Sequence, residues 1–466
     1  MIESHSKPRF WLLPIVLSLL LSTQLLAAQQ TQRQDTLHIS ITEAVAQALE
    51  MSEEIAAARA MVDQAASQIT QATSVALPQL TSNLTYNRAI KTIFDGIEFG
   101  APPGDSAGGT DDIFSDLPFG RPNIYIANLQ LSQLLFSGGS VGAARRVARH
   151  FRAAAQDQYL EVESELALQV RLAYLNAIAA QSLNQIALQS QGVSEAHLRQ
   201  VESFYRAGTT SEFDLLRARV DLENREPAVV QTANAAELAL LELKRLVNIP
   251  ASMPVALTTR EGPEMIDVDE QTLAPLVEAR PALHAARETV LMRQAAISAY
   301  NGQRFPSIRL SGNLGFQAFP LSVTPPGYSE WRKDWWIALG VNWTLFSGFR
   351  ISGEVAQARA ELQQAEAQEA QLREGLEVAL AAAMAEYRMA RAQIEARQQT
   401  EVLAERALEL ADARFANGLS TQLEVSDAQL LLDEARVNRV QAMYDYIRAL
   451  AQLERLSGGR LQLLRF

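Results

Sequence analysis

The sequence predicts a mainly helical fold with a membrane β part, built twice from the same unit of helix, two strands, long helix and return helix. Three observations predict this fold class. An extended segment at 334–346 has one apolar face, a set of short motifs recurs at constant spacing, and two long helical segments contain no proline. The chain is therefore interpreted as a duplication in which each half contributes two strands and three helical parts.

Large apolar residues alternate with small or polar ones in the segment 334–346. A period of two is the pattern of a strand with one apolar face. Trp335 and Trp343 share that face, and at about 3.3 Å per residue and a tilt of about 40° they stand roughly 20 Å apart along a membrane normal. This spacing is typical of the aromatic girdles of an outer-membrane barrel, with Tyr86 and Tyr125 as further girdle candidates. A strand half-buried in a soluble sandwich is the alternative.

The start of the chain has the features of a secretory signal at 1–28. Lys7 and Arg9 precede an apolar run at 10–26, and two alanines follow it. A retained membrane anchor is the alternative. The chain contains no cysteine, so disulfides, thiol chemistry and a cysteine-linked lipid anchor are excluded.

Composition limits the classes of function. The 466 residues carry a formal net charge of −12, which argues against nucleic acid as a partner. Beyond the signal no segment approaches 18 uninterrupted apolar residues, so we expect no transmembrane helix. If the mature chain crosses a membrane, it must do so with strands that close into a barrel and satisfy their backbone groups.

Motifs repeat in two registers along the chain. Phe136-Ser137-Gly138 recurs as Phe346-Ser347-Gly348, an offset of 346 − 136 = 210 residues, whereas Pro78 recurs as Pro306, an offset of 228. The first half thus holds an 18-residue insertion (228 − 210) between these two motifs. We predict a first repeat at 29–248, an inter-repeat linker at 249–268 and a second repeat at 269–466.

Each half has the same order of elements. A helical segment (about 41–74 and 269–302) ends before a proline, which stops the helix. The strands follow, at about 79–93 and 122–136 in the first half and about 307–319 and 334–346 in the second. A glycine turn then leads into a long helix (140–207 and 351–417) and a return helix (212–247 and 422–456).

The lengths of these elements predict how they assemble. Each long helix would measure about 100 Å, and the two shorter helices of a half together match it, so they would run end to end beside it. Four strands cannot close a barrel, because the smallest outer-membrane barrels have eight. The chain must therefore oligomerise if it inserts into a membrane, and three copies would supply twelve strands.

The chain resembles the TolC-like outer-membrane factor family over essentially all of the mature sequence. The similar features are Leu77-Pro78 and Phe305-Pro306, the turns Leu135-Phe136-Ser137-Gly138-Gly139 and Leu345-Phe346-Ser347-Gly348, and the paired segments FYRAGTTSEFDLLRARVDL and RFANGLSTQLEVSDAQLLL. The resemblance implies a homotrimer in the outer-membrane lipid of a Gram-negative bacterium. Its trimeric 12-stranded β-barrel would continue as a 12-helix α-barrel through the periplasm. It would dock on a periplasmic adaptor protein and an inner-membrane pump of the RND, ABC or MFS type.

The resemblance also assigns roles to residues near the two glycine turns. In the family these turns form the periplasmic tip, where the adaptor docks and an aperture opens. The docking candidates carried over are Gly208, Thr209, Thr210, Ser211, Gly418, Leu419, Ser420 and Thr421. Glu424 and Asp427 match the acids that line the aperture, and Asp214 matches an acid that helps to hold it shut.

Simpler roles are open for two of these acids. Thr421-x-x-Glu424 and Ser211-x-x-Asp214 are capping-box patterns, so both acids can serve to cap helix starts. Asp427 lies beyond the cap and is the better pore candidate. Ser420 stands where some members carry a gating arginine, and Arg414 or Arg217 are candidates to replace that bond.

Enzymatic chemistry is not expected. No histidine pair has the spacing of a helix metal site, and nucleophile or phosphate-binding motifs are missing from the sequence. We therefore expect no cofactor and no bound metal. An exit duct of a tripartite efflux or type I secretion system is the predicted function, with an exported coiled-coil scaffold or a general diffusion porin as alternatives. The sequence does not specify the transported substrate, the pump or the adaptor.

Overall fold

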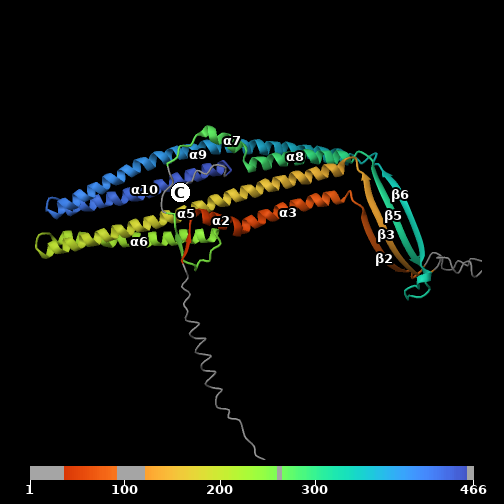
Figure 1. The fold of residues 1–466 in the computed structure, drawn as a ribbon, viewed down its shortest axis with the longest axis horizontal. Helices are drawn as coiled ribbons and strands as arrows, with labels where there is room; N and C mark the ends of the chain where they lie inside the picture. The colour runs from red at the N-terminus through yellow and green to blue at the C-terminus, as the bar shows by residue number, and fades with distance from the viewer. Residues whose placement is uncertain (1–35, 92–120, 260–264, 459–466) are drawn as a thin grey trace, which may run out of the picture.

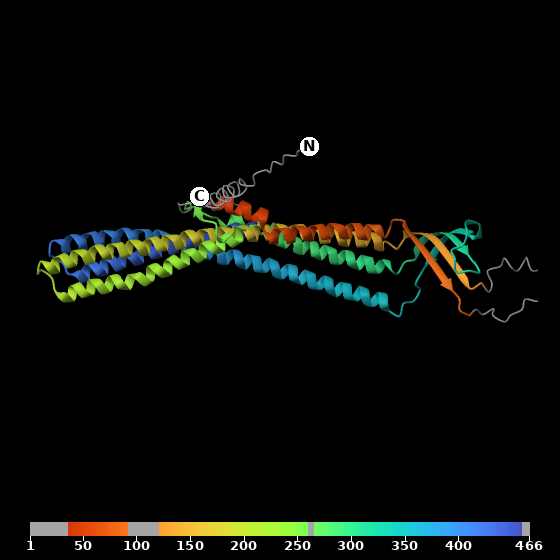
Figure 2. The same cartoon turned by 90° about the horizontal axis from the view of Figure 1, so that it is seen from below.

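The computed structural model describes residues 36–91, 121–259 and 265–458 of the chain. The molecule is elongated: long helices lie side by side as a rod, with a sheet at one end and two helix hairpins at the other (Figures 1 and 2). The predicted signal at 1–28 lies outside the described residues, as do residues 92–120 between the two predicted strands of the first half.

Two long helices run the length of the rod. They are α5 (Ser140–Arg206) and α9 (Arg350–Ala416), each of 67 residues and so about 100 Å long. The return helices α6 (Glu212–Leu246) and α10 (Gln422–Leu456) pack against them in the tip half. In the sheet half, α3 (Glu53–Ser74) packs on α5 and α8 (Pro281–Gly302) on α9. The prediction of two shorter helices beside each long one is confirmed (Figure 1).

The prediction of one unbroken first helix in each half is wrong. In the first half α2 (Ile41–Met51) and α3 are separated by Ser52, whose extended backbone and hydroxyl cap the start of α3. In the second half α7 (Glu270–Glu278) is separated from α8. Pro281 occupies the first turn of α8 and holds Arg280, the residue before it, in an extended conformation.

The four longer strands form one antiparallel sheet in the order β2–β3–β5–β6. They are β2 (Gln79–Arg88), β3 (Asn123–Phe136), β5 (Ser307–Ala318) and β6 (Arg332–Asn342). The two strands of each half pair with each other, and β3 pairs with β5 to join the halves. A short 3-10 helix, η1 (Tyr328–Glu330), lies between β5 and β6. Three bounds differ from prediction by two residues or more: β2 ends at Arg88 and not at 93, and β6 runs from Arg332 to Asn342 and not from 334 to 346.

The prediction that Trp343 lies within a strand is wrong. β6 ends at Asn342, which pairs with Ser307, the first residue of β5. Beyond that pair the next residue before β5 is Pro306, which has no backbone N–H to donate to the ladder. Trp343 instead donates from Nε1 to the carbonyl oxygen of Arg304 at 3.1 Å, at the junction between α8 and β5.

The register divides the sheet into an apolar and a polar face. On β2 and β6 the large side chains of the apolar face are exposed: Leu84 is 75 % exposed, Ile337 70 %, Trp335 69 % and Leu339 65 %. The opposite face carries mostly Gln, Thr, Asn and Ser. An exposed continuous apolar sheet face is expected to contact lipid or another chain.

Left-handed backbone makes the turn from sheet to helix in both halves. Gly138 (φ +62°) and Gly139 (φ +83°) form the first turn, and a Cβ on Gly138 would lie 2.3 Å from the carbonyl oxygen of Gly302. In the second half Gly348 (φ +60°) is followed by Phe349, which has φ 65° without being glycine. The predicted glycine turns are confirmed at all three glycines, and Phe349 is a further left-handed position that was not predicted.

The linker is more ordered than the sequence suggested. Its strand β4 (Val255–Leu257) pairs in parallel with β1 (Leu37–Ile39), and the hydroxyl of Tyr174 on α5 donates to the carbonyl oxygen of Ile39 at 2.9 Å. Two apolar cores lie near this point, one around α5 and the other around α9. The middle of the rod is therefore its most fully packed part.

Within the described ranges, the helices are too polar or too short to span a bilayer.

Candidate functional site

Both helix hairpins turn at a glycine at the end of the rod. Gly208 (φ +75°) follows α5 and Gly418 (φ +69°) follows α9. In each turn the N–H of the glycine and the N–H of the next residue donate to carbonyl oxygens of the last helical turn. After α5 both distances are 3.0 Å, and after α9 they are 2.9 Å for Gly418 and 2.8 Å for Leu419. This is a Schellman ending, which requires a left-handed residue and favours glycine. The duplicated sequence thus builds the same turn twice.

Reciprocal capping boxes begin the two return helices. The Ser211 hydroxyl accepts from Asp214 N at 3.2 Å, while the Asp214 carboxylate accepts from Ser211 N at 3.3 Å. Thr421 and Glu424 exchange the equivalent bonds at 3.4 and 3.3 Å. The capping interpretation of both acids is confirmed.

Hydrogen bonding sets the charge of Asp214. The hydroxyl of Ser211 donates to its carboxylate at 2.6 Å and holds the pKa of Asp214 below its usual range. Because the pKa is lowered in the folded state, this cap stabilises the turn above the ordinary carboxyl range, and the contribution is lost as pH falls through the lowered pKa.

The other predicted gating groups occupy separate positions on α9 and α10. Asp427 is exposed, and no side-chain partner is found for it among the described residues. Arg414 lies 3.8 Å from the Glu424 carboxylate and donates to the carbonyl oxygen of Leu419 at 3.2 Å. Ser420 donates to the carbonyl oxygen of Ala411 at 3.3 Å. Arg414 therefore contacts the acid of its own hairpin.

Part of the predicted tip site surrounds one cavity between the hairpins, of about 440 Å³. Of the predicted residues, Thr209, Thr210, Asp214, Gly418, Ser420 and Thr421 line it. Gly208, Ser211, Leu419, Glu424 and Asp427 do not line it. The cavity brings together residues about 210 positions apart in sequence, so the two repeats meet at the tip.

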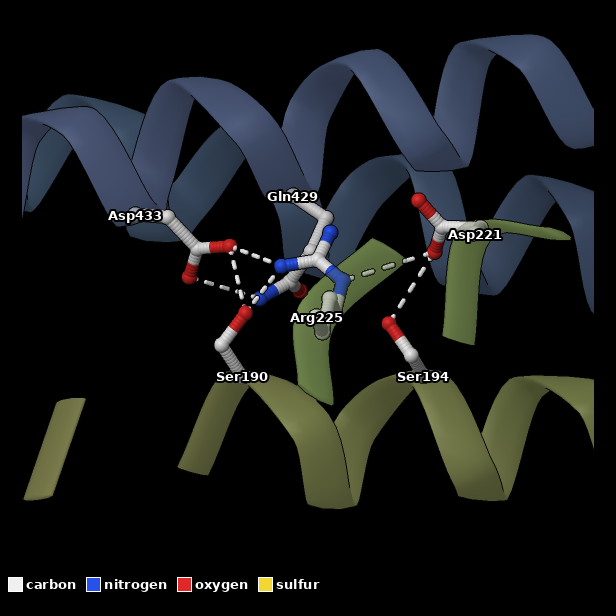
Figure 3. A network of polar contacts seen from close by, with 6 residues as sticks. All are labelled: Ser190, Ser194, Asp221, Arg225, Gln429 and Asp433. Carbon is white, nitrogen blue, oxygen red and sulfur yellow. Dashed lines mark hydrogen bonds and ion pairs between the residues drawn. The ribbon is translucent and has the colours of Figure 1, made fainter. Parts of the chain in front are cut away.

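A buried ion-pair network further along the hairpins was not foreseen from the sequence (Figure 3). Arg225 of α6 donates to the Asp433 carboxylate of α10 at 2.6 Å, and Ser190 of α5 donates to the same carboxylate at 2.7 Å. The side chains of Arg225 and Asp433 are only 16 % and 15 % exposed. This contact therefore ties the first hairpin to the second where little water reaches it.

Neighbouring polar groups complete the network. Asp221 lies 3.5 Å from Arg225 Nε and accepts from Ser194 at 3.0 Å, while Gln429 donates to the second Asp433 oxygen at 3.0 Å (Figure 3). The sequence feature that could have pointed to this network is Ser190, a residue with a hydroxyl group in an otherwise apolar helical seam. Its partners on other helices cannot be identified from spacing within α5.

A second cavity, of about 420 Å³, lies between this network and the tip. His197, Asp221 and Asp412 are among its lining residues. Burial lowers the pKa of His197 and raises the pKa of Asp412, so burial disfavours the charged form of each. No hydrogen-bond partner is found for His197 Nε2 in the described part of the chain. The packing between the hairpins is thus incomplete here.

Three of the four girdle candidates, Trp335, Tyr86 and Tyr125, lie on the sheet, and Trp343 lies just beyond the end of β6. Tyr86 and Tyr125 are directly opposite each other on β2 and β3, with ring centroids 4.7 Å apart. Their hydroxyls donate to Asn123 at 2.8 Å and to the carbonyl oxygen of Val323 at 2.6 Å. Within the described residues no group of three or more His, Asp or Glu side chains could hold a metal ion.

Comparisons with known proteins assign the chain to a family. The family described as "Outer membrane efflux protein" matches residues 44–248 and 274–459. TolC of Vibrio cholerae is 23 % identical over 447 residues, which cover 90 % of each chain. CyaE of Bordetella pertussis is 27 % identical over 270 residues, and this match covers 57 % of the chain and 56 % of CyaE.

Solved structures share the fold. A membrane protein from Pseudomonas aeruginosa superimposes with a TM-score of 0.74 at 21 % identity, covering 90 % of this chain and 93 % of that one. The CmeC outer membrane channel of Campylobacter jejuni gives a TM-score of 0.72 at 19 % identity, covering 91 % and 87 %. Because the family match covers most of both halves, the chain belongs to the outer membrane efflux protein family.

Proposed function

We propose that three copies of this chain close a single channel, a 12-stranded β-barrel in outer-membrane lipid continued by a 12-helix α-barrel through the periplasm. As a member of its family the chain is an outer-membrane exit duct for efflux in a Gram-negative bacterium, and it is not an enzyme. The proposal concerns how many copies form the duct, which residues line it and what docks on it.

The sheet carries the proposal. In the described part of the chain, β2 and β6 each have one edge without a strand partner, and large apolar side chains on one face are exposed, among them Leu84, Trp335, Ile337 and Leu339. A lipid-exposed sheet cannot leave its edges unpaired. Pairing β6 of each copy with β2 of the next satisfies both edges, and three copies give a number of strands known for outer-membrane barrels.

The rod supports the same arrangement. The helices continue from the sheet for about 100 Å, so a ring of three rods would prolong the pore. A general diffusion porin does not need such a rod, and a scaffold without a pore leaves the exposed apolar face unexplained. The tip would then dock a periplasmic adaptor and, through it, an inner-membrane pump of the RND, ABC or MFS type.

Gly418 tests the docking role of the tip. A phenylalanine there is expected to abolish efflux while leaving trimers in the outer membrane, because a Cβ at this position meets no atom within 4 Å and a bulky side chain projects from the turn. Asparagine tolerates left-handed backbone, so Gly418→Asn should keep most activity. Efflux would be measured as accumulation of a fluorescent dye in cells that lack the native copy. Unchanged efflux by Gly418→Phe would contradict docking at this turn.

Asp427 tests the aperture. Threefold symmetry would place three Asp427 and three Glu424 carboxylates in two rings, and such rings favour cations. Asp427→Asn removes half of these charges and is expected to lower the cation-to-anion permeability ratio by about half in single-channel recordings. Asp63→Asn, on the exposed surface of α3 in the sheet half, is the control. A ratio equal to that of wild type would remove Asp427 from the pore.

A further inference from the structure

Arg309 is the charged residue in the part of the sheet nearest the helices. It lies in β5 opposite Leu134 of β3 and Gly340 of β6. Its position has the same parity as Ser311 and Asn313, so it belongs to the polar face, which faces the lumen of the proposed barrel. Arg309 would therefore face the channel rather than lipid.

Neutral residues surround Arg309 on that face. The adjacent positions on this face are Ser132, Leu134, Ser307, Ser311, Ala338, Gly340 and Asn342. The other charged positions on this face of the described strands, Arg332 and Asp334, lie at the opposite end of β6, beside Gln317 and Gly315. On the described strands, therefore, no carboxylate lies beside Arg309.

The guanidinium of Arg309 is positioned and accessible. Its Nη1 donates to the hydroxyl of Ser132 at 2.9 Å, across β5 and β3, and the side chain is exposed. Gly340 on the other side has no side chain that could cover it. Ser311, which pairs with Ser132, adds a second hydroxyl next to the same spot. Four of the five guanidinium N–H groups remain available for an acceptor.

We propose that the three Arg309 side chains form a cationic ring at the base of the barrel that binds anionic groups of the cargo, carboxylates or phosphates. The inference rests on the proposed trimeric barrel. Guanidinium groups bind such oxyanions through paired hydrogen bonds, and the serine hydroxyls supply further donors. Cargo entering past the acids of the tip would thus meet a ring of the opposite charge before leaving the channel.

Blockade of purified trimers in planar bilayers tests the ring. Inorganic tripolyphosphate or citrate, added on the barrel side, is expected to block wild-type conductance. Arg309→Gln should raise the concentration for half-block by about tenfold, and Arg309→Lys should retain most of the block because the charge remains. Stronger block by citrate than by tripolyphosphate, or the reverse, would identify which oxyanion the ring prefers.

Arg88→Gln is the matched control, because Arg88 is exposed on the same sheet but shares the apolar face with Tyr86 and Leu84. Its half-block concentration should equal that of wild type. Equal block of wild type and Arg309→Gln would overturn the ring while leaving the channel intact. Purified wild-type trimers that gave no conductance at all would overturn the proposed pore as well.

Discussion

Lysine in place of Leu339 is expected to prevent stable insertion of the protein into the outer membrane. Leu339 lies near the middle of β6, 65 % exposed on the apolar face. A lysine facing lipid near the bilayer midplane costs about 2–4 kcal/mol, and a trimer would incur this cost three times. The amount of protein in the outer-membrane fraction, and the share that migrates as a trimer in native electrophoresis, measure the effect.

The adjacent residue supplies the control. Ala338 pairs with Ser311 on the polar face, so a lysine at 338 would extend into the water-filled lumen. Ala338→Lys is expected to accumulate in the outer membrane at close to the wild-type level, although it adds the same charge one residue away. If both variants inserted equally well, or if Ala338→Lys were the defective one, the assignment of the two faces would be contradicted.

Leucine in place of Arg225 is expected to loosen the tip half of the rod. The change leaves the mostly buried Asp433 carboxylate without its cation, and breaking such a buried pair costs about 3–5 kcal/mol. Because Arg225 lies on the first hairpin and Asp433 on the second, the loss should appear as separation of the two hairpins. Faster amide hydrogen exchange in α6 and α10, with little change in the sheet, is the expected measurement.

Two further variants separate charge burial from loss of packing. Removing both charges in Arg225→Leu with Asp433→Leu should recover most of the lost protection, because no unpaired charge remains buried. Arg245→Leu breaks the exposed pair with Glu242 and should cost no more than about 1 kcal/mol. A double variant that exchanges as fast as Arg225→Leu would show that lost packing, and not the unpaired charge, loosens the hairpins. Wild-type exchange rates in Arg225→Leu itself would show that the network does not hold the hairpins together.

Features that depend on local sequence were predictable. Pro78 and Pro306 stop helices wherever the rest of the chain goes, and a period of two marks a strand with one apolar face. The long helices α5 and α9 lack proline. The change in offset between matching motifs, from 228 to 210 residues, locates an insertion in one loop of the first half. Even the missed break at Ser52 had a local signal, since this serine precedes two glutamates that begin α3.

Features that depend on contacts between distant segments were not predictable. β6 ends before Trp343 because Pro306, just before its partner β5, has no N–H to donate to the ladder, and spacing within β6 cannot reveal this. The pairing of β1 with β4 joins residues about 218 positions apart. The network of Arg225, Asp433 and Ser190 requires three helices to meet. Ser190 stands out in an apolar seam, but Arg225 and Asp433 cannot be identified as its partners from the sequence.

The mass of the particle extracted from the outer membrane in mild detergent tests the central claim most directly. The sheet, with two unpaired edges in the described chain and one exposed apolar face, leads us to expect three chains per particle. Native mass spectrometry should therefore give three times the mass of the mature chain, with no smaller species that keeps detergent bound. A detergent-bound particle containing a single chain would contradict the account.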